Sequence, residues 1–236
     1  MPELLHYSNP FTDRQLPRAV FALRNDPLAA GRTVNFHDPV QGYAVGTSES
    51  VGANLLIDDF PWVELGIVEA GELTLQGDDY RLDLKAGDCF VVPSGIPIRW
   101  QHRGTLRRVF MAFPGLAPSN DMPTRPLKID FSRTLQACNP PAANVLLTPT
   151  PKAWSEELFA CANLRIGLWQ CEAYGRKSVE PSYSELMFIL EGAVTLTPEQ
   201  GPACRVSAGE VVMVPAGVAT AWNTEETVRK VYCIVS

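Results

Sequence analysis

The sequence predicts an all-β protein with two tandem barrels, and three observations support this fold class. The segment AGDCFVVPSGIPIRW (86–100) matches AGEVVMVPAGVATAW (208–222) without a gap, with identity at six of fifteen positions. Short runs rich in Val, Ile, Leu and aromatic residues are separated by Gly, Asp and Pro at close intervals, which is typical of β-barrels and sandwiches. Inside the repeat, no helical period interrupts these runs.

The repeat extends beyond this pair of segments and divides the chain. Two further blocks match at nearly the same spacing: ELGIVEAGELTL (64–75) with ELMFILEGAVTL (185–196), and RRVFMAF (107–113) with RKVYCIV (229–235). The duplicated unit therefore covers 44–113 and 165–235. Four segments follow from it: an N-terminal extension (1–40), a first barrel (41–113), a linker (114–155) and a second barrel (156–236).

The segments outside the repeat are rich in proline. The N-terminal extension contains Pro10, Pro17, Pro27 and Pro39 among its prolines. We expect this segment to cover a sheet edge, because an exposed edge invites pairing with other chains. The linker holds eight prolines, so we expect an extended crossover with turns. A short helix is expected at its end, at WSEELFA (154–160), with Ser155 as the N-cap.

The residues that the two copies share are mostly turn-formers. Gly87 and Gly209 each precede an acidic residue and suit a turn that requires positive φ before a strand. Pro93 and Pro215, each followed two residues later by Gly, form the next bend. We interpret these residues as builders of the fold with no part in chemistry.

Composition and charge exclude several classes of partner. The chain has 236 residues, of which 46% are hydrophobic, and this is enough for a substantial core. Its net charge of −6 and the lack of any basic run argue against a nucleic-acid partner. The apolar stretches are short and the N-terminus has no leader pattern, so we expect no membrane association and a cytoplasmic location. The six scattered cysteines fit small buried hydrophobic residues.

Both copies carry a pattern that resembles the two motifs of the cupin superfamily. The first motif corresponds to 64–71 and 185–192, and the second to 87–100 and 209–222. Within the superfamily, SELMFILEGAVTLT with the VPAG block after it resembles the cupin-domain family named for (S)-ureidoglycine aminohydrolase, most of whose members have no assigned reaction. The resemblance implies two double-stranded β-helix (jelly-roll) barrels that pair as an intramolecular pseudo-dimer.

Most cupin enzymes hold a divalent metal with two histidines and a glutamate of the first motif and a histidine of the second. The resemblance therefore implies such a site here. The glutamate is present as Glu64 and Glu185. The position of the second-motif histidine holds Ile98 in one copy and Thr220 in the other, and the first-motif histidines are also replaced. One carboxylate among apolar neighbours cannot supply four ligands. No cofactor is therefore predicted. The residual alternative is a divalent cation on Asp58 and Glu64, which can share a strand face.

Strand alternation predicts a small-molecule pocket in each barrel, with aromatic residues around a carboxylate. The candidate lining residues are Trp62, Glu64, Ile98, Trp100 and His102 in the first barrel, and Tyr183, Glu185, Thr220 and Trp222 in the second. The alternative is that the aromatic residues fill the core and that each glutamate pairs with a cation such as Arg108 or Lys230. A buried glutamate without a cation would have a raised pKa and could act as an acid or base.

Two functions fit these observations. The favoured one is a protein that binds a small molecule in one or both barrels without catalysis, because the barrel residues are intact and the usual metal ligands are replaced. The alternative is an enzyme on a small nitrogenous or amino-acid-derived metabolite, either a hydrolase as the resemblance implies or a metal-free acid/base catalyst using Glu64 or Glu185. We expect a monomer with two paired barrels or a homodimer.

Overall fold

The computed structural model describes residues 3–8, 11, 16–117 and 122–236, and it confirms the all-β fold class. The chain divides into two compact units. We call residues 9–129 the N-terminal barrel, and residues 1–8 with 130–236 the C-terminal barrel. Helical structure in the described residues is limited to the short 3-10 turn η1 (Ala143–Val145), and no helix there is long and apolar enough to cross a membrane.

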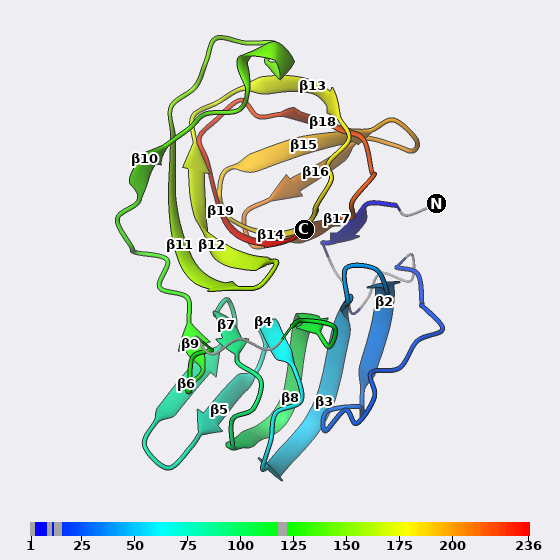
Figure 1. Ribbon diagram of the computed structural model, residues 1–236, viewed down its shortest axis with the longest axis vertical. Helices are drawn as coiled ribbons and strands as arrows, with labels where there is room; N and C mark the ends of the chain where they lie inside the picture. Colours follow the sequence, from blue (N-terminus) through cyan, green and yellow to red (C-terminus); the bar gives the residue numbers. More distant parts are fainter. Residues whose placement is uncertain (1–2, 9–10, 12–15, 118–121) are drawn as a thin grey trace. The chain divides into compact units, whose positions relative to one another are not determined.

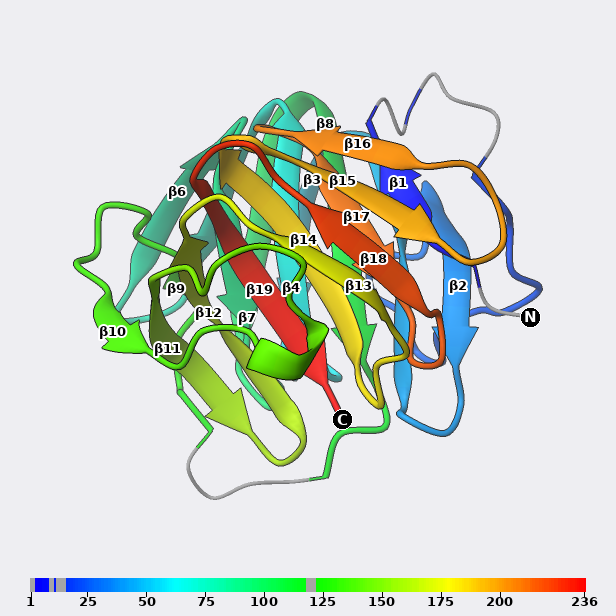
Figure 2. The ribbon, with the colours of Figure 1, turned by 90° about the horizontal axis from the view of Figure 1, so that it is seen from above.

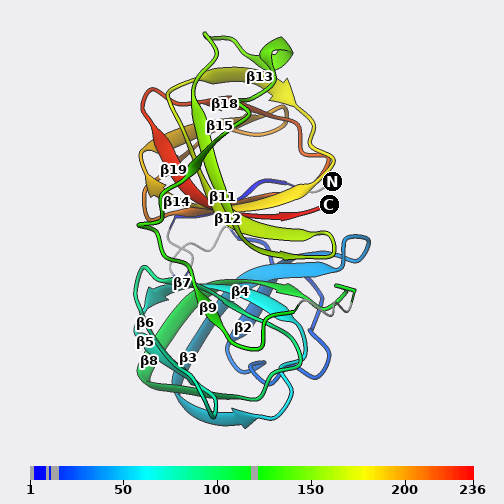
Figure 3. The ribbon, with the colours of Figure 1, turned by 60° about the vertical axis from the view of Figure 1, so that its left-hand side comes forward.

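The N-terminal barrel is one sheet of eight strands (Figure 1). They are β2 (Arg32–Asp38), β3 (Tyr43–Ile57), β4 (Val63–Ala70), β5 (Glu72–Gln76), β6 (Arg81–Lys85), β7 (Cys89–Val92), β8 (Ile98–Phe113) and β9 (Leu127–Lys128). Six of them follow the order β2-β3-β8-β4-β7-β9, while β5 pairs with β6 and β8. Strand β8 pairs with β4 at one end and with β5 at the other, so it curves around the barrel (Figure 3).

The inner face of β8 follows the alternation that the sequence predicts. Ile98, Trp100 and His102 are buried, whereas Arg99 and Arg103 are exposed. Successive side chains of a strand point to opposite faces, so the three buried residues point into the barrel. Ile98 and Trp100 belong to its apolar core.

The C-terminal barrel has a seven-stranded and a four-stranded sheet. Its strands are β1 (Leu5–Tyr7), β10 (Gln136–Cys138), β11 (Ala153–Cys161), β12 (Leu164–Cys171), β13 (Gly175–Val179), β14 (Ser184–Glu191), β15 (Ala193–Pro198), β16 (Cys204–Ser207), β17 (Val211–Val214), β18 (Thr220–Asn223) and β19 (Val228–Val235). The larger sheet has the order β1-β17-β14-β19-β12-β11-β10. The smaller has the order β13-β18-β15-β16, and these four strands lie side by side in Figure 2.

The start of the N-terminal extension covers a sheet edge, as predicted. Strand β1 pairs antiparallel with β17, with His6 opposite Val212. The ring nitrogen Nε2 of His6 also lies 3.1 Å from Oε2 of Glu210. Residues 5–7 therefore extend the larger sheet of the C-terminal barrel, although most of the extension belongs to the N-terminal barrel. Pro10 lies outside the described residues.

The short helix expected at 154–160 is wrong, because this segment is strand β11. Strand β11 pairs along its length with β12 and at its start with β10. The Ser155 hydroxyl does not cap a helix but donates a hydrogen bond to the carbonyl oxygen of Leu168 on β12. Strand pairing on both sides thus overrides the weak local helix signal.

The turn residues shared by the two copies adopt the predicted conformation. Gly87 has φ of 87° and Gly209 has φ of 89°. Their amides make equivalent bonds of 2.8 Å, from Gly87 to the carbonyl of Val68 and from Gly209 to that of Ile189. A Cβ at either position would meet no atom within 4 Å, so the backbone conformation rather than space favours glycine.

Candidate functional site

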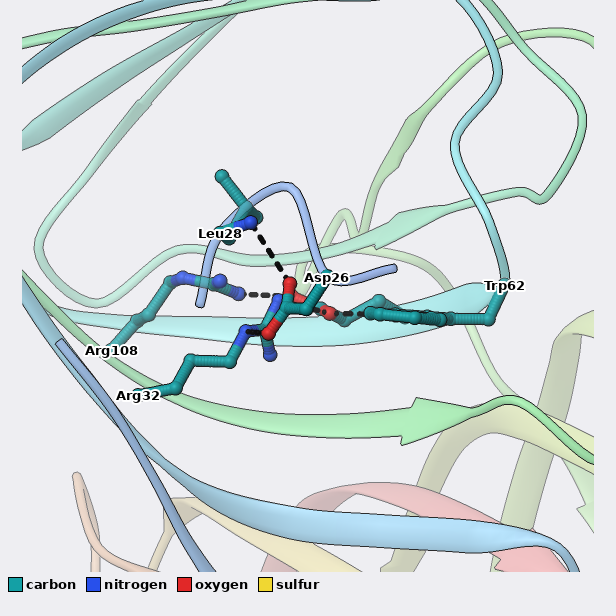
Figure 4. Close-up of polar contacts among 6 residues, drawn as sticks. Asp26, Leu28, Arg32, Trp62 and Arg108 are labelled. Atoms are coloured by element: carbon teal, nitrogen blue, oxygen red, sulfur yellow. Dashed lines mark hydrogen bonds and ion pairs between the residues drawn. The ribbon is translucent and has the colours of Figure 1, made fainter. Parts of the chain in front are cut away.

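The candidate site is a chain of four charged side chains inside the N-terminal barrel (Figure 4). Glu64 comes from β4 and Arg108 from β8, which are antiparallel neighbours. Arg32 is the first residue of β2, and Asp26 lies in the segment before it. Glu64 is 0% exposed and Arg108 is 1% exposed. Such deeply buried charges require partners, and each of the four has one.

Glu64 is held on both carboxylate oxygens. Oε1 accepts a hydrogen bond from Nη1 of Arg108. Oε2 accepts one from Nη2 of Arg32 at 2.7 Å and one from the indole Nε1 of Trp62 at 3.0 Å. Burial alone would raise the pKa of Glu64, but the two arginines and the Trp62 hydrogen bond lower it to about 2. The carboxylate is therefore ionised at neutral pH and fixed in place.

Asp26 continues the row of charged side chains on the other side of Arg32. Its Oδ2 lies 2.8 Å from Nε of Arg32, and its Oδ1 accepts a hydrogen bond of 2.9 Å from the amide of Leu28. Burial raises the pKa of Asp26, and this outweighs the opposing effect of Arg32. With Asp26 and Glu64 ionised, two acids and two bases alternate, and their formal charges cancel.

The two guanidinium groups lie on aromatic rings and keep unused donors. Cζ of Arg108 is 4.7 Å from the ring centroid of Trp100, and Cζ of Arg32 is 4.2 Å from that of Phe110. Nη2 of Arg108 and Nη1 of Arg32 are buried, and among the residues that the structure describes neither has a hydrogen-bond partner. A buried charged donor without an acceptor is costly, so each of these atoms calls for an explanation.

A cavity of about 500 Å³ lies beside Arg108 in the same barrel. Its wall combines apolar groups of Leu28, Trp100 and Leu106 with the polar side chains of Ser50 and His102. Strand register accounts for this arrangement, since Leu106 and Arg108 of β8 lie opposite Ser50 and Ser48 of β3 on the inner face.

His102 and Ser50 form a hydrogen-bonded pair in the wall of this cavity. Nδ1 of His102 is 3.2 Å from the carbonyl oxygen of Gly104, and Nε2 is 3.0 Å from Oγ of Ser50. A carbonyl oxygen only accepts, so the ring proton is on Nδ1, and Nε2 accepts the hydroxyl proton of Ser50. Burial lowers the pKa of His102, so its ring is neutral at neutral pH.

The equivalent position of the C-terminal barrel holds a simpler ion pair. Nζ of Lys230 donates to Oε1 of Glu185 at 2.8 Å. It also lies 4.9 Å from the ring centroid of Trp169 and 5.1 Å from that of Trp222. The side chain of Glu185 is 15% exposed, so this pair is less deeply buried than the Glu64–Arg108 pair.

Both halves of the chain match the same kind of family. A model described as a cupin domain matches residues 61–112, and one described as an EutQ-like cupin domain matches residues 159–232. The chain belongs to the cupin superfamily. No functionally curated protein matches it.

Solved structures share this bicupin fold. A protein of unknown function in the DUF861 family from Pseudomonas syringae pv. tomato str. DC3000 is 26% identical, with a TM-score of 0.92 over 100% of both chains. A cupin 2 conserved barrel domain protein from Leptotrichia buccalis is 13% identical, with a TM-score of 0.59 over 87% of each chain. The protein Ylba from E. coli, also of DUF861, is 11% identical, with a TM-score of 0.59 over 99% of this chain and 90% of that one. The last two show the fold alone.

The sequence-predicted residues of the first cupin barrel come together only in part. Trp62 and Glu64 hydrogen bond to each other, and Trp100 and His102 line the cavity. Ile98 is buried in the apolar core. The alternative of a cation partner is confirmed, since Glu64 pairs with Arg108. The condition for a raised pKa, a buried glutamate without a cation, is not met at Glu64, whose pKa is lowered.

The residues predicted to line a pocket in the second barrel also lie in different surroundings. Trp222 and Thr220 are buried, and the Thr220 hydroxyl donates to the carbonyl of Val218. Tyr183 is 37% exposed, so it is not enclosed in a pocket. The nearby charge of Glu185 raises the pKa of Tyr183. Glu185 pairs with Lys230, which confirms the cation-partner alternative here too.

The Asp58–Glu64 pair suggested for a divalent cation is not formed. Asp58 is exposed in the bend after β3, whereas the oxygens of Glu64 are bound by Arg32, Arg108 and Trp62. Two guanidinium groups against the carboxylate repel a divalent cation. Within the described part of the chain, His, Cys, Asp and Glu side chains form no group of three that could hold a metal. The residues present therefore do not fit the usual cupin metal.

Sequence reasoning missed Asp26, Arg32 and Ser50. The first two lie in the N-terminal extension, outside the repeat, so no second copy marks them. Ser50 lies in a strand whose pairing with β8 sets its position beside His102. Buried charged residues such as these follow no fixed spacing in the sequence. Only the path of the folded chain brings them together.

Proposed function

We propose that this cupin binds a small organic molecule in the cavity of its N-terminal barrel. The observation that carries the proposal is Arg108, which lines the cavity, is 1% exposed and has a buried Nη2 without a partner among the described residues. An unused charged donor at a cavity wall is satisfied when a ligand supplies the acceptor.

The size and chemistry of the cavity support the proposal. Its volume of about 500 Å³ lies within the usual range for small-molecule sites. Apolar walls with a few converging polar groups are typical of such sites. The Asp26–Arg32–Glu64–Arg108 chain fixes the Arg108 guanidinium before a ligand arrives, which reduces the entropy lost on binding.

An acid/base enzyme that uses the two glutamates has less support. Glu64 is ionised, with a pKa of about 2, and both of its oxygens are occupied by donors. A general base needs a pKa near the working pH and access to the reacting proton. Glu185 is bound to Lys230.

Ligand-observed NMR with a library of small polar fragments tests the proposal. Fragments are expected to bind the wild-type protein and to be lost from the Ala53→Trp variant, because Ala53 lines the cavity opposite His102. Ala221→Trp is the matched control, since Ala221 is a half-buried alanine of β18 in the other barrel. Equal fragment binding by wild type and Ala53→Trp, or no binding by either, would refute a binding function for this cavity.

A further inference from the structure

We infer that the molecule bound in the N-terminal barrel is a small carboxylic acid that also carries a hydroxyl or amino group. Its carboxylate accepts from Nη2 of Arg108, and its second group donates to Oγ of Ser50. This inference rests on the proposed function and adds the chemical class of the ligand.

The carboxylate follows from an unused donor of Arg108, a residue of the cavity wall. Nη1 of Arg108 is bound to Glu64, while the buried Nη2 finds no acceptor in the described residues. A guanidinium presents its donors in a fixed planar fork, so one edge can hold Glu64 while another faces a ligand. Hydrogen bonds from a charged donor are strongest when the acceptor is also charged.

The donor group follows from the hydrogen bonding of Ser50. The proton of its hydroxyl is directed at Nε2 of His102, whose own proton is held on Nδ1 by the carbonyl of Gly104. Oγ of Ser50 can therefore only accept from a further partner. A ligand hydroxyl or amino group satisfies it, whereas a second carboxylate would find no proton there.

The two contact points lie within reach of one small molecule. Arg108 lies directly opposite Ser48 on β3, and Ser50 is two residues further along the same face. Such diagonal neighbours are about 7–8 Å apart at Cα. A short hydroxy or amino acid spans the gap between a long arginine side chain and a serine hydroxyl at this separation.

Arg108 is paired with Glu64, so it offers a ligand a free charged donor rather than an uncompensated charge. Among the described residues that line the cavity, two are charged, Arg108 and Glu49. The side chain of Glu49 is 45% exposed and is bound through Oε2 to Nε of Arg107 at 2.5 Å. His102 is neutral at neutral pH. The inner wall thus offers the ligand one charged side chain, Arg108, through the donor that Glu64 does not use.

Calorimetric titration with matched probes tests the inference: 3-hydroxybutanoate, its amide 3-hydroxybutanamide, and butanoate, which lacks the hydroxyl. In the wild type we expect the acid to bind at least about tenfold more tightly than the amide, since one charge-assisted hydrogen bond distinguishes them. We expect Ser50→Ala to bind 3-hydroxybutanoate no more tightly than butanoate. Ala53→Trp should bind none of the three, and Ala221→Trp should behave as the wild type.

Each outcome separates the inference from the proposed function. If neutral fragments bind in the cavity but the acid binds no more tightly than the amide, the carboxylate inference is overturned and the binding function stands. If the acid binds equally to Ala53→Trp, it binds elsewhere and the inference is also overturned. If neither these probes nor the fragments show binding that depends on Ala53, both proposals fail. Ser50→Ala changes a half-buried side chain, so folding is not at risk as it would be for Arg108.

Discussion

The Glu64→Gln substitution tests the buried charge chain most directly. It removes the negative charge that two buried guanidinium groups share. The pKa of Glu64 is about 2, against an ordinary value of 4.5. This difference corresponds to about 3 kcal/mol of stability at neutral pH. Breaking a buried ion pair by removing one partner costs about 3–5 kcal/mol in other proteins, so the two estimates agree.

The pH dependence of this loss has a defined sign. Because the folded-state pKa of Glu64 is lowered, its contribution is fully present above pH 4.5 and is lost as the pH falls through about 2. The wild type and Glu64→Gln should therefore differ most at neutral pH and converge near pH 2. Urea unfolding should be followed by hydrogen exchange resolved by peptide, since a chain of two units does not have a single free energy of unfolding.

Glu185→Gln is the matched control for this prediction. It makes the same chemical change at the equivalent position of the other barrel, where the glutamate is 15% exposed and has one cationic partner. We expect a clearly smaller loss, confined to the C-terminal barrel. A loss below about 1 kcal/mol in Glu64→Gln, or equal losses for the two variants, would refute the view that the charge chain stabilises the N-terminal barrel.

Three further predictions concern single features of the fold. Trp62→Phe removes one donor to Glu64 and should cost the N-terminal barrel about 1–2 kcal/mol in urea unfolding. Gly87→Ala and Gly209→Ala should each lower the stability of their own barrel by about 1 kcal/mol, because alanine disfavours positive φ; an unchanged melting temperature would contradict this. Removal of residues 1–8 deletes β1 and should increase hydrogen exchange in β17, while exchange in β4 should stay the same.

Features that depend on strand alternation and duplication were predictable from the sequence. The two barrels, the positive φ of Gly87 and Gly209, and the burial of Trp100 and His102 all follow from local pattern or from comparison of the copies. Each of these features is determined within a few residues, so the sequence holds enough information to place it.

Features that depend on long-range pairing were not predictable. The segment 154–160 has a local helix signal, yet its neighbours β10 and β12 make it a strand. Asp26 and Arg32 reach Glu64 because the N-terminal extension runs along the barrel, and no spacing in the sequence encodes this path. For the same reason the sequence predicted only some of the residues that line the candidate cavity.

One difference between the two barrels is the cation that binds the buried glutamate. Arg108 and Lys230 occupy equivalent register positions, opposite Val68 on β4 and Ile189 on β14. Both bind the glutamate of their own barrel. The lysine carries its charge on one nitrogen, which lies among Glu185, Met187 and two tryptophan rings. The planar guanidinium of Arg108 can bind Glu64 with one nitrogen and still direct another donor at a ligand. We therefore expect Arg108→Lys to keep the ion pair with Glu64 and to lose the ligand proposed for the N-terminal barrel.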